Sequence, residues 1–274
     1  MNSGNQYLRL ENWVDQCLSK GKYSFSLDEV RDNFVKDSAA AIKQSLNRLV
    51  RKQKVVSVFK AYYVIVSPQY QPMGILPASM FIDGLMGFLG RKYYVGLLNA
   101  AALNGSSHQQ PQEYFVVTEY PVLRTTDKKG IKINYISTRK MPPESLTEKK
   151  KTTTGFMTVS KPILTAIDLI SYEKRTGGLN RASEVINELS EIIKPKDINE
   201  ELILFSSVSS LQRIGYIFEV VLGNNVLAER IFKLCQKAAL SFSIIPLKAS
   251  GSKDYSGMNS KWKIAINTEI DIDS

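Results

Sequence analysis

The chain has 274 residues, of which 43% are hydrophobic, and its 36 Lys and Arg outnumber its 26 Asp and Glu to give a net charge of +10. This length fits about two domains of ordinary size, and the hydrophobic share excludes disorder over the whole chain. The positive charge favours a polyanionic partner. Two cysteines and one histidine are too few for a disulfide framework or for a zinc site made from these residues.

No targeting or membrane-spanning segment stands out. Residues 1–6 are polar and do not form a basic start followed by an apolar run. The longest apolar stretch, residues 75–90, contains Pro77 and Asp83 and is shorter than the about 20 apolar residues that cross a bilayer. We therefore expect a cytoplasmic protein with two buried, reduced cysteines, no metal ion, no cofactor and no membrane partner.

The first 68 residues predict a compact unit of three helices and a hairpin. Apolar residues at helical spacing between Leu10 and Leu18 indicate the first helix. Ser26 followed by Glu29 is a capping-box pattern for a second helix, which ends near Phe34. The remaining expected elements are a third helix capped by Asp37 or Ser38 and running to about Lys52, and two strands, 54–59 and 62–66, joined at Lys60 and Ala61. This order is typical of a winged helix-turn-helix.

Residues 69–274 predict a larger domain of mixed helices and strands, so that the whole chain is of the α+β class. Several prolines between Pro68 and Pro77 mark the boundary. Residues 140–155 resemble a loop. Periodicity indicates helices over 78–89, 93–103, 161–173, 181–193, 200–222 and 226–240, and strands over 113–118, 122–126, 131–137, 243–247 and 262–267.

Basic residues are concentrated near the N-terminus. Residues 1–68 carry 11 basic and 6 acidic side chains, whereas the three-times-longer remainder carries 25 and 20. In the third expected helix, Ile42, Leu46 and Leu49 share an apolar face. The opposite side presents a stripe of basic and amide side chains at spacings of three and four, namely Lys43, Gln44, Asn47, Arg48 and Arg51.

This stripe has the chemistry of a DNA-reading helix. An α-helix fits the major groove, where Arg pairs with guanine and Asn or Gln pairs with adenine. Lys54 and Lys60 on the hairpin are candidates for contact with a phosphate or the minor groove. Two other readings stay open at this point: a solvated helix face, and a winged helix that docks onto another protein.

A second basic segment runs from residue 120 to residue 161, with ten basic and three acidic side chains. It is expected either to follow a nucleic-acid backbone without reading bases, or to be a flexible charged loop. Its candidate residues are Lys128, Lys129, Lys132, Lys149, Lys150 and Lys151.

Catalytic motifs are missing from the sequence. It contains no phosphate-binding GxxxxGK[ST] loop, no GxGxxG after a strand and no GxSxG elbow. His108 follows Ser106 and Ser107 in a polar loop, where neighbours in sequence rarely form a working dyad. A nuclease centre around Glu148 and Lys150 is the remaining enzymatic alternative, and we predict no catalytic residue.

An ordered set of motifs resembles the AbiEi-type antitoxins of bacterial abortive-infection systems. The set covers most of the chain, and it departs from the family at Ala61, where the wing often has Gly, and at Asn104, where His is frequent. Its members are Lys60–Val64 in the wing, Tyr93–Gly105, the strand Tyr114–Val117, Pro162–Leu169, Gln212–Tyr216 and Asn259–Trp262.

The resemblance implies a two-domain antitoxin of a type IV toxin–antitoxin system. The winged helix of such a protein represses its own operon by binding promoter repeats in double-stranded DNA. Its C-terminal domain counters a nucleotidyltransferase-type toxin encoded beside it, without a stable complex between the two proteins. A role in phage defence follows from the same resemblance.

Overall fold

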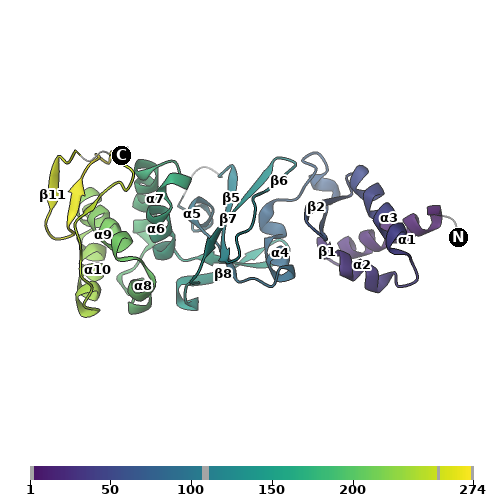
Figure 1. Ribbon diagram of the computed structural model, residues 1–274, viewed down its shortest axis with the longest axis horizontal. Helices are drawn as coiled ribbons and strands as arrows, with labels where there is room; N and C mark the ends of the chain where they lie inside the picture. The colour runs from purple at the N-terminus through teal and green to yellow at the C-terminus, as the bar shows by residue number, and fades with distance from the viewer. Residues whose placement is uncertain (1–2, 107–110, 252–253, 273–274) are drawn as a thin grey trace. The chain divides into compact units, whose positions relative to one another are not determined.

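The computed structural model describes residues 3–106, 111–251 and 254–272 (Figure 1). His108 lies outside these ranges. Internal contacts divide the chain into two compact units: unit 1 comprises residues 1–94, 112–141 and 149–158, and unit 2 comprises residues 95–111, 142–148 and 159–274. Helices and several sheets make the fold α+β. The domain boundary expected near residue 68 lies within unit 1 of this division. That boundary remains a prediction.

The N-terminal part of unit 1 has the expected order of elements. A short strand that the sequence pattern did not indicate precedes the second helix and pairs with the hairpin. The elements are α1 (Ser3–Ser19), β1 (Ser24–Ser26), α2 (Leu27–Asn33), α3 (Ala39–Arg51), β2 (Val55–Phe59) and β3 (Tyr62–Ile65). The three strands form an antiparallel sheet in the order β1-β3-β2.

Local side-chain hydrogen bonds explain where α2 and α3 begin. Glu29 N donates to Ser26 Oγ at 3.1 Å, and Ser26 N donates to Glu29 Oε2 at 2.7 Å, which confirms the capping box. Ala41 N donates to Ser38 Oγ at 3.2 Å. Of the two expected caps for α3, Ser38 rather than Asp37 therefore caps the helix.

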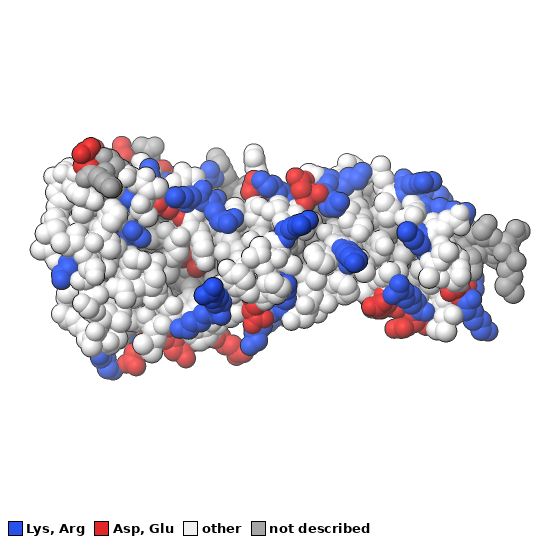
Figure 2. Space-filling model, viewed as in Figure 1, with Lys and Arg blue, Asp and Glu red and all other residues white. Residues whose placement is uncertain are grey.

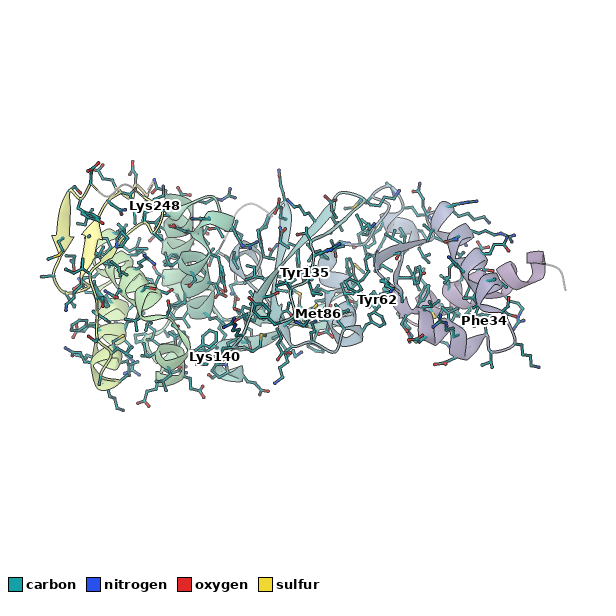
Figure 3. The ribbon with its side chains drawn as sticks, viewed as in Figure 1. Phe34, Tyr62, Met86, Tyr135, Lys140 and Lys248 are labelled. Atoms are coloured by element: carbon teal, nitrogen blue, oxygen red, sulfur yellow. The ribbon has the colours of Figure 1, made fainter. Side chains whose placement is uncertain are left out.

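These elements enclose one apolar core. Residues from α1, α2, α3, β1, β2 and β3 contribute to it, among them Leu10, Phe34 and Leu49 (Phe34 is labelled in Figure 3). The indole of Trp13 packs edge-on against the ring of Phe25, with centroids 5.2 Å apart. The apolar face of α3 packs into this core. The opposite face of the helix is therefore the one that carries the exposed side chains.

A six-stranded sheet follows in the chain, with strand order β6-β7-β5-β4-β9-β8. Strands β5 and β7 pair in parallel over seven residues, and β6 pairs antiparallel with β7. Before the sheet come the 3-10 helices η1 (Pro68–Tyr70) and η2 (Ala78–Met80) and the helix α4 (Ile82–Phe88). The strands are β4 (Tyr93–Val95), β5 (Glu113–Glu119), β6 (Thr126–Lys128), β7 (Ile131–Thr138), β8 (Thr147–Thr152) and β9 (Gly155–Ser160).

Three expectations in this region are wrong. The apolar run 93–103 is not one helix, because β4 ends at Val95 and Leu97, at φ 53°, opens a separate helix. The strand expected over 122–126 begins only at Thr126. The segment 140–155 is not a loop throughout, because residues 147–152 form β8 and β9 begins at Gly155.

Unit 2 is mainly helical and ends in a small sheet with strand order β10-β12-β11. The expected helix 200–222 is divided, because Ser207 caps a new helix by accepting from Ser210 N at 3.1 Å. The helices are α5 (Leu97–Leu103), η3 (Glu144–Leu146), α6 (Pro162–Ser171), η4 (Glu173–Arg175), α7 (Leu179–Ile192), η5 (Pro195–Asp197), α8 (Glu200–Phe205), α9 (Val208–Tyr216), the π-helix η6 (Ile217–Val221) and α10 (Asn225–Lys237), and the strands are β10 (Ile245–Pro246), β11 (Gly257–Asn259) and β12 (Ile264–Ile266).

Trp262 anchors the C-terminal sheet to α9. Its side chain is fully buried, and its ring lies where a side chain at Gly215 would have to sit. Gln212 Nε2 donates to Trp262 O at 2.7 Å and to Ser243 O at 2.8 Å. The indole nitrogen donates to Glu219 in η6. Two of the motifs that carry the family resemblance, 212–216 and 259–262, are thus packed together as core.

Within the described ranges, no helix has both the length and the apolar character needed to cross a membrane. The same ranges contain no group of three or more His, Cys, Asp or Glu placed to hold a metal ion. Both cysteines are free and buried, and burial raises the pKa of the Cys235 thiol to about 11.

Candidate nucleic-acid interface

Helix α3 presents two chemically different faces. Ile42, Leu46 and Leu49 are buried against the core, together with Ser45. The outward face is exposed and carries Lys43, Gln44, Asn47 and Arg51. Figure 2 shows Lys and Arg side chains gathered over the part of the molecule where Figure 1 draws α3. The structure therefore places four of the candidate residues on one accessible surface.

Arg48 and Lys54 differ from these four. Arg48 is half-buried at the flank of the helix. Lys54, at the start of the hairpin, has its Nζ 2.8 Å from Glu11 Oε1 and 3.6 Å from Asp15 Oδ2, both on α1. The hydrogen bond with Glu11 raises the pKa of Lys54. Because its charge is already compensated within the fold, we leave Lys54 out of the interface.

Two carboxylates of the N-terminal elements, Asp37 and Glu11, are paired with cations. Helix α3 itself contains no acidic residue, and Asp37 in the preceding turn lies 3.8 Å from Arg9 of α1, with 10% of its side chain exposed. The carboxylate of Glu11 forms an ion pair with the ammonium of Lys54 and lies 3.8 Å from the ammonium of Lys52. The outward face of α3 therefore carries positive charge, and the carboxylate of Asp37 just before the helix is paired with Arg9.

Lys60 is exposed at the tip of the β2–β3 hairpin. Its neighbour Ala61 has φ 61°, a left-handed conformation that accounts for the Gly often found at this place in the family resemblance. Lys60 lines a cavity of about 390 Å³ together with residues of β2 and with Arg124 and Lys128. Sequence reasoning missed Arg124, because only the fold brings residue 124 beside the hairpin.

The second basic segment divides into two separate groups. Lys128, Lys129 and Lys132 lie on or beside β6 and β7, at one edge of the six-stranded sheet, whereas Lys149, Lys150 and Lys151 lie on β8, the opposite edge. The strand order therefore separates the six candidate residues into two groups at opposite edges of the sheet. The side chains of Lys129 and of Gln53, which follows α3, both lie beside Gly74, so Lys129 is close to the end of α3.

Some lysines of the two groups are engaged within the fold. Lys132 Nζ lies 2.7 Å from Glu113 Oε1, and this hydrogen bond raises the pKa of Lys132. Lys149 lies 4.0 Å from Asp83. Lys149 and Lys151 are exposed while Lys150 is half-buried, as the alternation of a strand requires. Lysines on an edge strand hinder pairing with a second chain, which is a structural role for this group.

Comparison with known proteins links the central part of the chain to one family. Residues 94–220 match the family model described as the AbiEi antitoxin C-terminal domain. The chain is similar to the crystal structure of the RV2827C protein from Mycobacterium tuberculosis, with a TM-score of 0.62 and 12% sequence identity over 92% of this chain and 89% of that chain. At this identity the likeness establishes the fold alone. No curated protein sequence matches the chain. The match over residues 94–220 supports an AbiEi-type antitoxin family for this chain.

Proposed function

We propose that residues 1–68 form a winged helix-turn-helix that binds double-stranded DNA, with α3 as the recognition helix. The observation that carries this proposal is the exposed outward face of α3, which combines Lys43, Gln44, Asn47 and Arg51 in a helix without acidic residues. The order of the elements and the three-stranded sheet support the same reading.

Each side chain of this face has a distinct role in the proposal. Arg51 and, at the flank, Arg48 donate to guanine O6 and N7, and Gln44 and Asn47 bond the N6 and N7 of adenine. Lys43 contacts a phosphate near the start of the helix. Lys60 at the hairpin tip contacts a neighbouring phosphate, which fixes the position of the domain without reading sequence.

The test is a titration of the full chain with DNA from upstream of its own reading frame. Arg51→Ala and Asn47→Ala are each expected to weaken binding by about 1–3 kcal/mol, which is about 5- to 150-fold. Lys196→Ala, an exposed lysine of unit 2, is the matched control and is expected to bind as the unaltered protein does. Unchanged affinity in both interface variants contradicts the assignment.

The group at the β6 edge extends this surface in the proposal. Arg124 and Lys128 share a cavity with Lys60, so a phosphate backbone that contacts the hairpin tip also passes these two side chains. Such contacts add affinity for any sequence and increase its dependence on salt. Lys128→Ala is therefore expected to weaken specific and nonspecific DNA by similar factors and to reduce the salt slope by about one.

The family supports an antitoxin role for the chain. We assign to it the neutralisation of a nucleotidyltransferase-type toxin encoded beside it, without a stable complex, together with repression of its own promoter repeats. Co-expression with that toxin tests the first part, because growth should recover although the two proteins do not copurify. The double variant Lys43→Glu/Arg51→Glu should still restore growth while it no longer represses the promoter.

Docking onto a protein is the other role that a winged helix can have. It predicts capture of a partner with little dependence on salt, whereas a DNA complex loses affinity steeply as salt rises. The same titration, repeated at several salt concentrations, separates the two. We assign no catalytic role to any residue.

A further inference from the structure

The end of α3 that would enter the groove carries apolar groups among the cations. Ala39 and Ala40, the first two residues of the helix, are both exposed. Val35, in the turn that precedes the helix, is 81% exposed and is the most exposed large apolar side chain among the described residues. Isolated apolar residues are common on protein surfaces, so exposure alone does not indicate a contact. The position of Ala40 and Val35 relative to the basic face is what distinguishes them.

Helical geometry places Ala40 in line with the polar stripe. Residues 40, 43, 44, 47 and 51 are separated by three or four positions, so they follow one another along a single face. Ala40 therefore occupies the N-terminal end of the same face that carries Lys43, Gln44 and Asn47. Its side chain is a single methyl group and is exposed to solvent.

The surroundings allow a close approach by a polyanion. The first turn of α3 contains no acidic residue, and the side chain of Asp37 is held by Arg9 and mostly covered. Ser38 contributes only its hydroxyl, which is used to cap the helix at Ala41 N. Ala40 lies on the basic face of α3 and Val35 in the turn that leads into it, and exposed apolar atoms beside cations suit an anionic partner that also has exposed methyl groups.

The major groove of DNA has such a group. Thymine presents its 5-methyl there, beside the N6 and N7 of the adenine with which it pairs, and Ala side chains make apolar contact with it. We infer that Ala40 and Val35 contact thymine methyl groups, while Gln44 or Asn47 reads the neighbouring adenine. This inference rests on the proposed DNA binding by α3, and it adds the base composition: the part of the DNA site under the start of α3 consists of A·T pairs.

Replacement of thymine by uracil tests the inference, because it removes the methyl group and leaves the hydrogen-bonding groups unchanged. The probe is the upstream DNA prepared with either thymine or uracil, titrated with the full chain at one salt concentration. Burial of one methyl group is worth about 0.8 kcal/mol, so we expect the thymine duplex to bind about 3- to 10-fold more tightly.

Variants locate the effect. Ala40→Gly and Val35→Ser should each reduce binding to the thymine duplex and diminish the preference over uracil. Ala40→Gly could also weaken binding by destabilising the helix. Ala40→Ser is therefore a second variant, because Ser is well suited to the first turn of a helix but replaces the methyl group with a polar one. Val226→Ala, which truncates a side chain 65% exposed in unit 2, is the control and should retain the full preference.

The outcomes separate this inference from the function on which it rests. Tight binding of the thymine and uracil duplexes with equal affinity overturns the methyl contact and leaves the proposed DNA binding intact. A preference that persists unchanged in the Ala40 and Val35 variants also overturns it, because other residues would then contact the methyl group. No binding to either duplex contradicts the proposed function itself.

Discussion

The ammonium of Lys54 lies 2.8 Å from the carboxylate of Glu11, so the start of the β2–β3 hairpin is joined to α1 by an ion pair. Asp15 lies 3.6 Å from the same ammonium. Lysines of the N-terminal elements therefore serve two purposes. Lys54 pairs with two carboxylates of α1, whereas Lys43 and Lys60 are exposed to solvent.

Lys54→Met should separate these two purposes. We expect the free energy of unfolding to fall by at most about 1 kcal/mol, because the pair is partly exposed and screened by solvent. Affinity for upstream DNA should stay within about twofold of the unaltered protein, since a charge already paired contributes little to counterion release. Urea denaturation and a DNA titration measure the two effects. A larger loss of DNA affinity than Lys43→Met causes would return Lys54 to the interface.

The capping box gives the N-terminal elements a dependence on pH. Burial acts to raise the pKa of Glu29, but the hydrogen bonds from Lys22 and from the backbone of Ser26 outweigh it and lower the pKa. A carboxyl whose pKa is lower in the folded state stabilises the fold above its unfolded pKa of about 4.3, and this contribution is lost as pH falls through the folded pKa.

Glu29→Gln should therefore reduce stability at pH 7, by less than about 1 kcal/mol because the side chain is partly exposed. The difference from the unaltered protein should shrink as pH falls below about 4. Thermal unfolding across this pH range checks the prediction, with Asp32→Asn, an exposed carboxyl of the same helix, as the control. A difference that is constant with pH would show that the charge of Glu29 contributes nothing.

Gly215 is expected to tolerate no side chain. A Cβ at this position overlaps the ring of Trp262, which is fully buried and has no room to move. Gly215→Ala should destabilise the protein by about 2–4 kcal/mol. Gly87→Ala in α4 is the matched control, because nothing lies within 4 Å of a Cβ there. That variant should be neutral or stabilising by up to about 1 kcal/mol. Equal melting temperatures for the two variants would contradict the packing described.

Ala61 is strained, so Ala61→Gly should stabilise the protein. At φ 61° a residue with a side chain is disfavoured and Gly is not. The expected gain is about 0.5–1 kcal/mol, measured as a shift of the urea midpoint. DNA binding should be unchanged, because the substitution removes one methyl group and leaves the hairpin and Lys60 in place. A loss of stability would mean that the methyl of Ala61 packs more favourably than its conformation costs.

Local signals in the sequence predicted most of the N-terminal fold. The Ser26 and Glu29 pattern marks the start of α2, and the spacing of Ile42, Leu46 and Leu49 orients α3, because both depend on residues within about two turns. Long-range pairing could not be seen in the same way. Strand β8 contains three successive lysines and resembles a loop until its position at the edge of a sheet is known.

The candidate interface likewise has one part that could be predicted from local sequence and one part that could not. The outward face of α3 follows from helical spacing alone. The pairing of Lys54 with α1, the separation of Lys128 from Lys149, and the position of Arg124 beside the hairpin all depend on contacts between residues far apart in sequence. No pattern local to any of these residues contains that information.

The most direct test of the account measures binding of the full chain to its upstream DNA as a function of salt. The unaltered protein should lose affinity steeply between about 50 and 200 mM salt. The variant Lys43→Glu/Arg51→Glu should bind at least about 100-fold more weakly. The charge-matched variant Lys174→Glu/Lys196→Glu, altered at exposed lysines of unit 2, should bind as the unaltered protein does. Equal affinity of all three proteins, or binding that does not depend on salt, would contradict a DNA-reading role for α3.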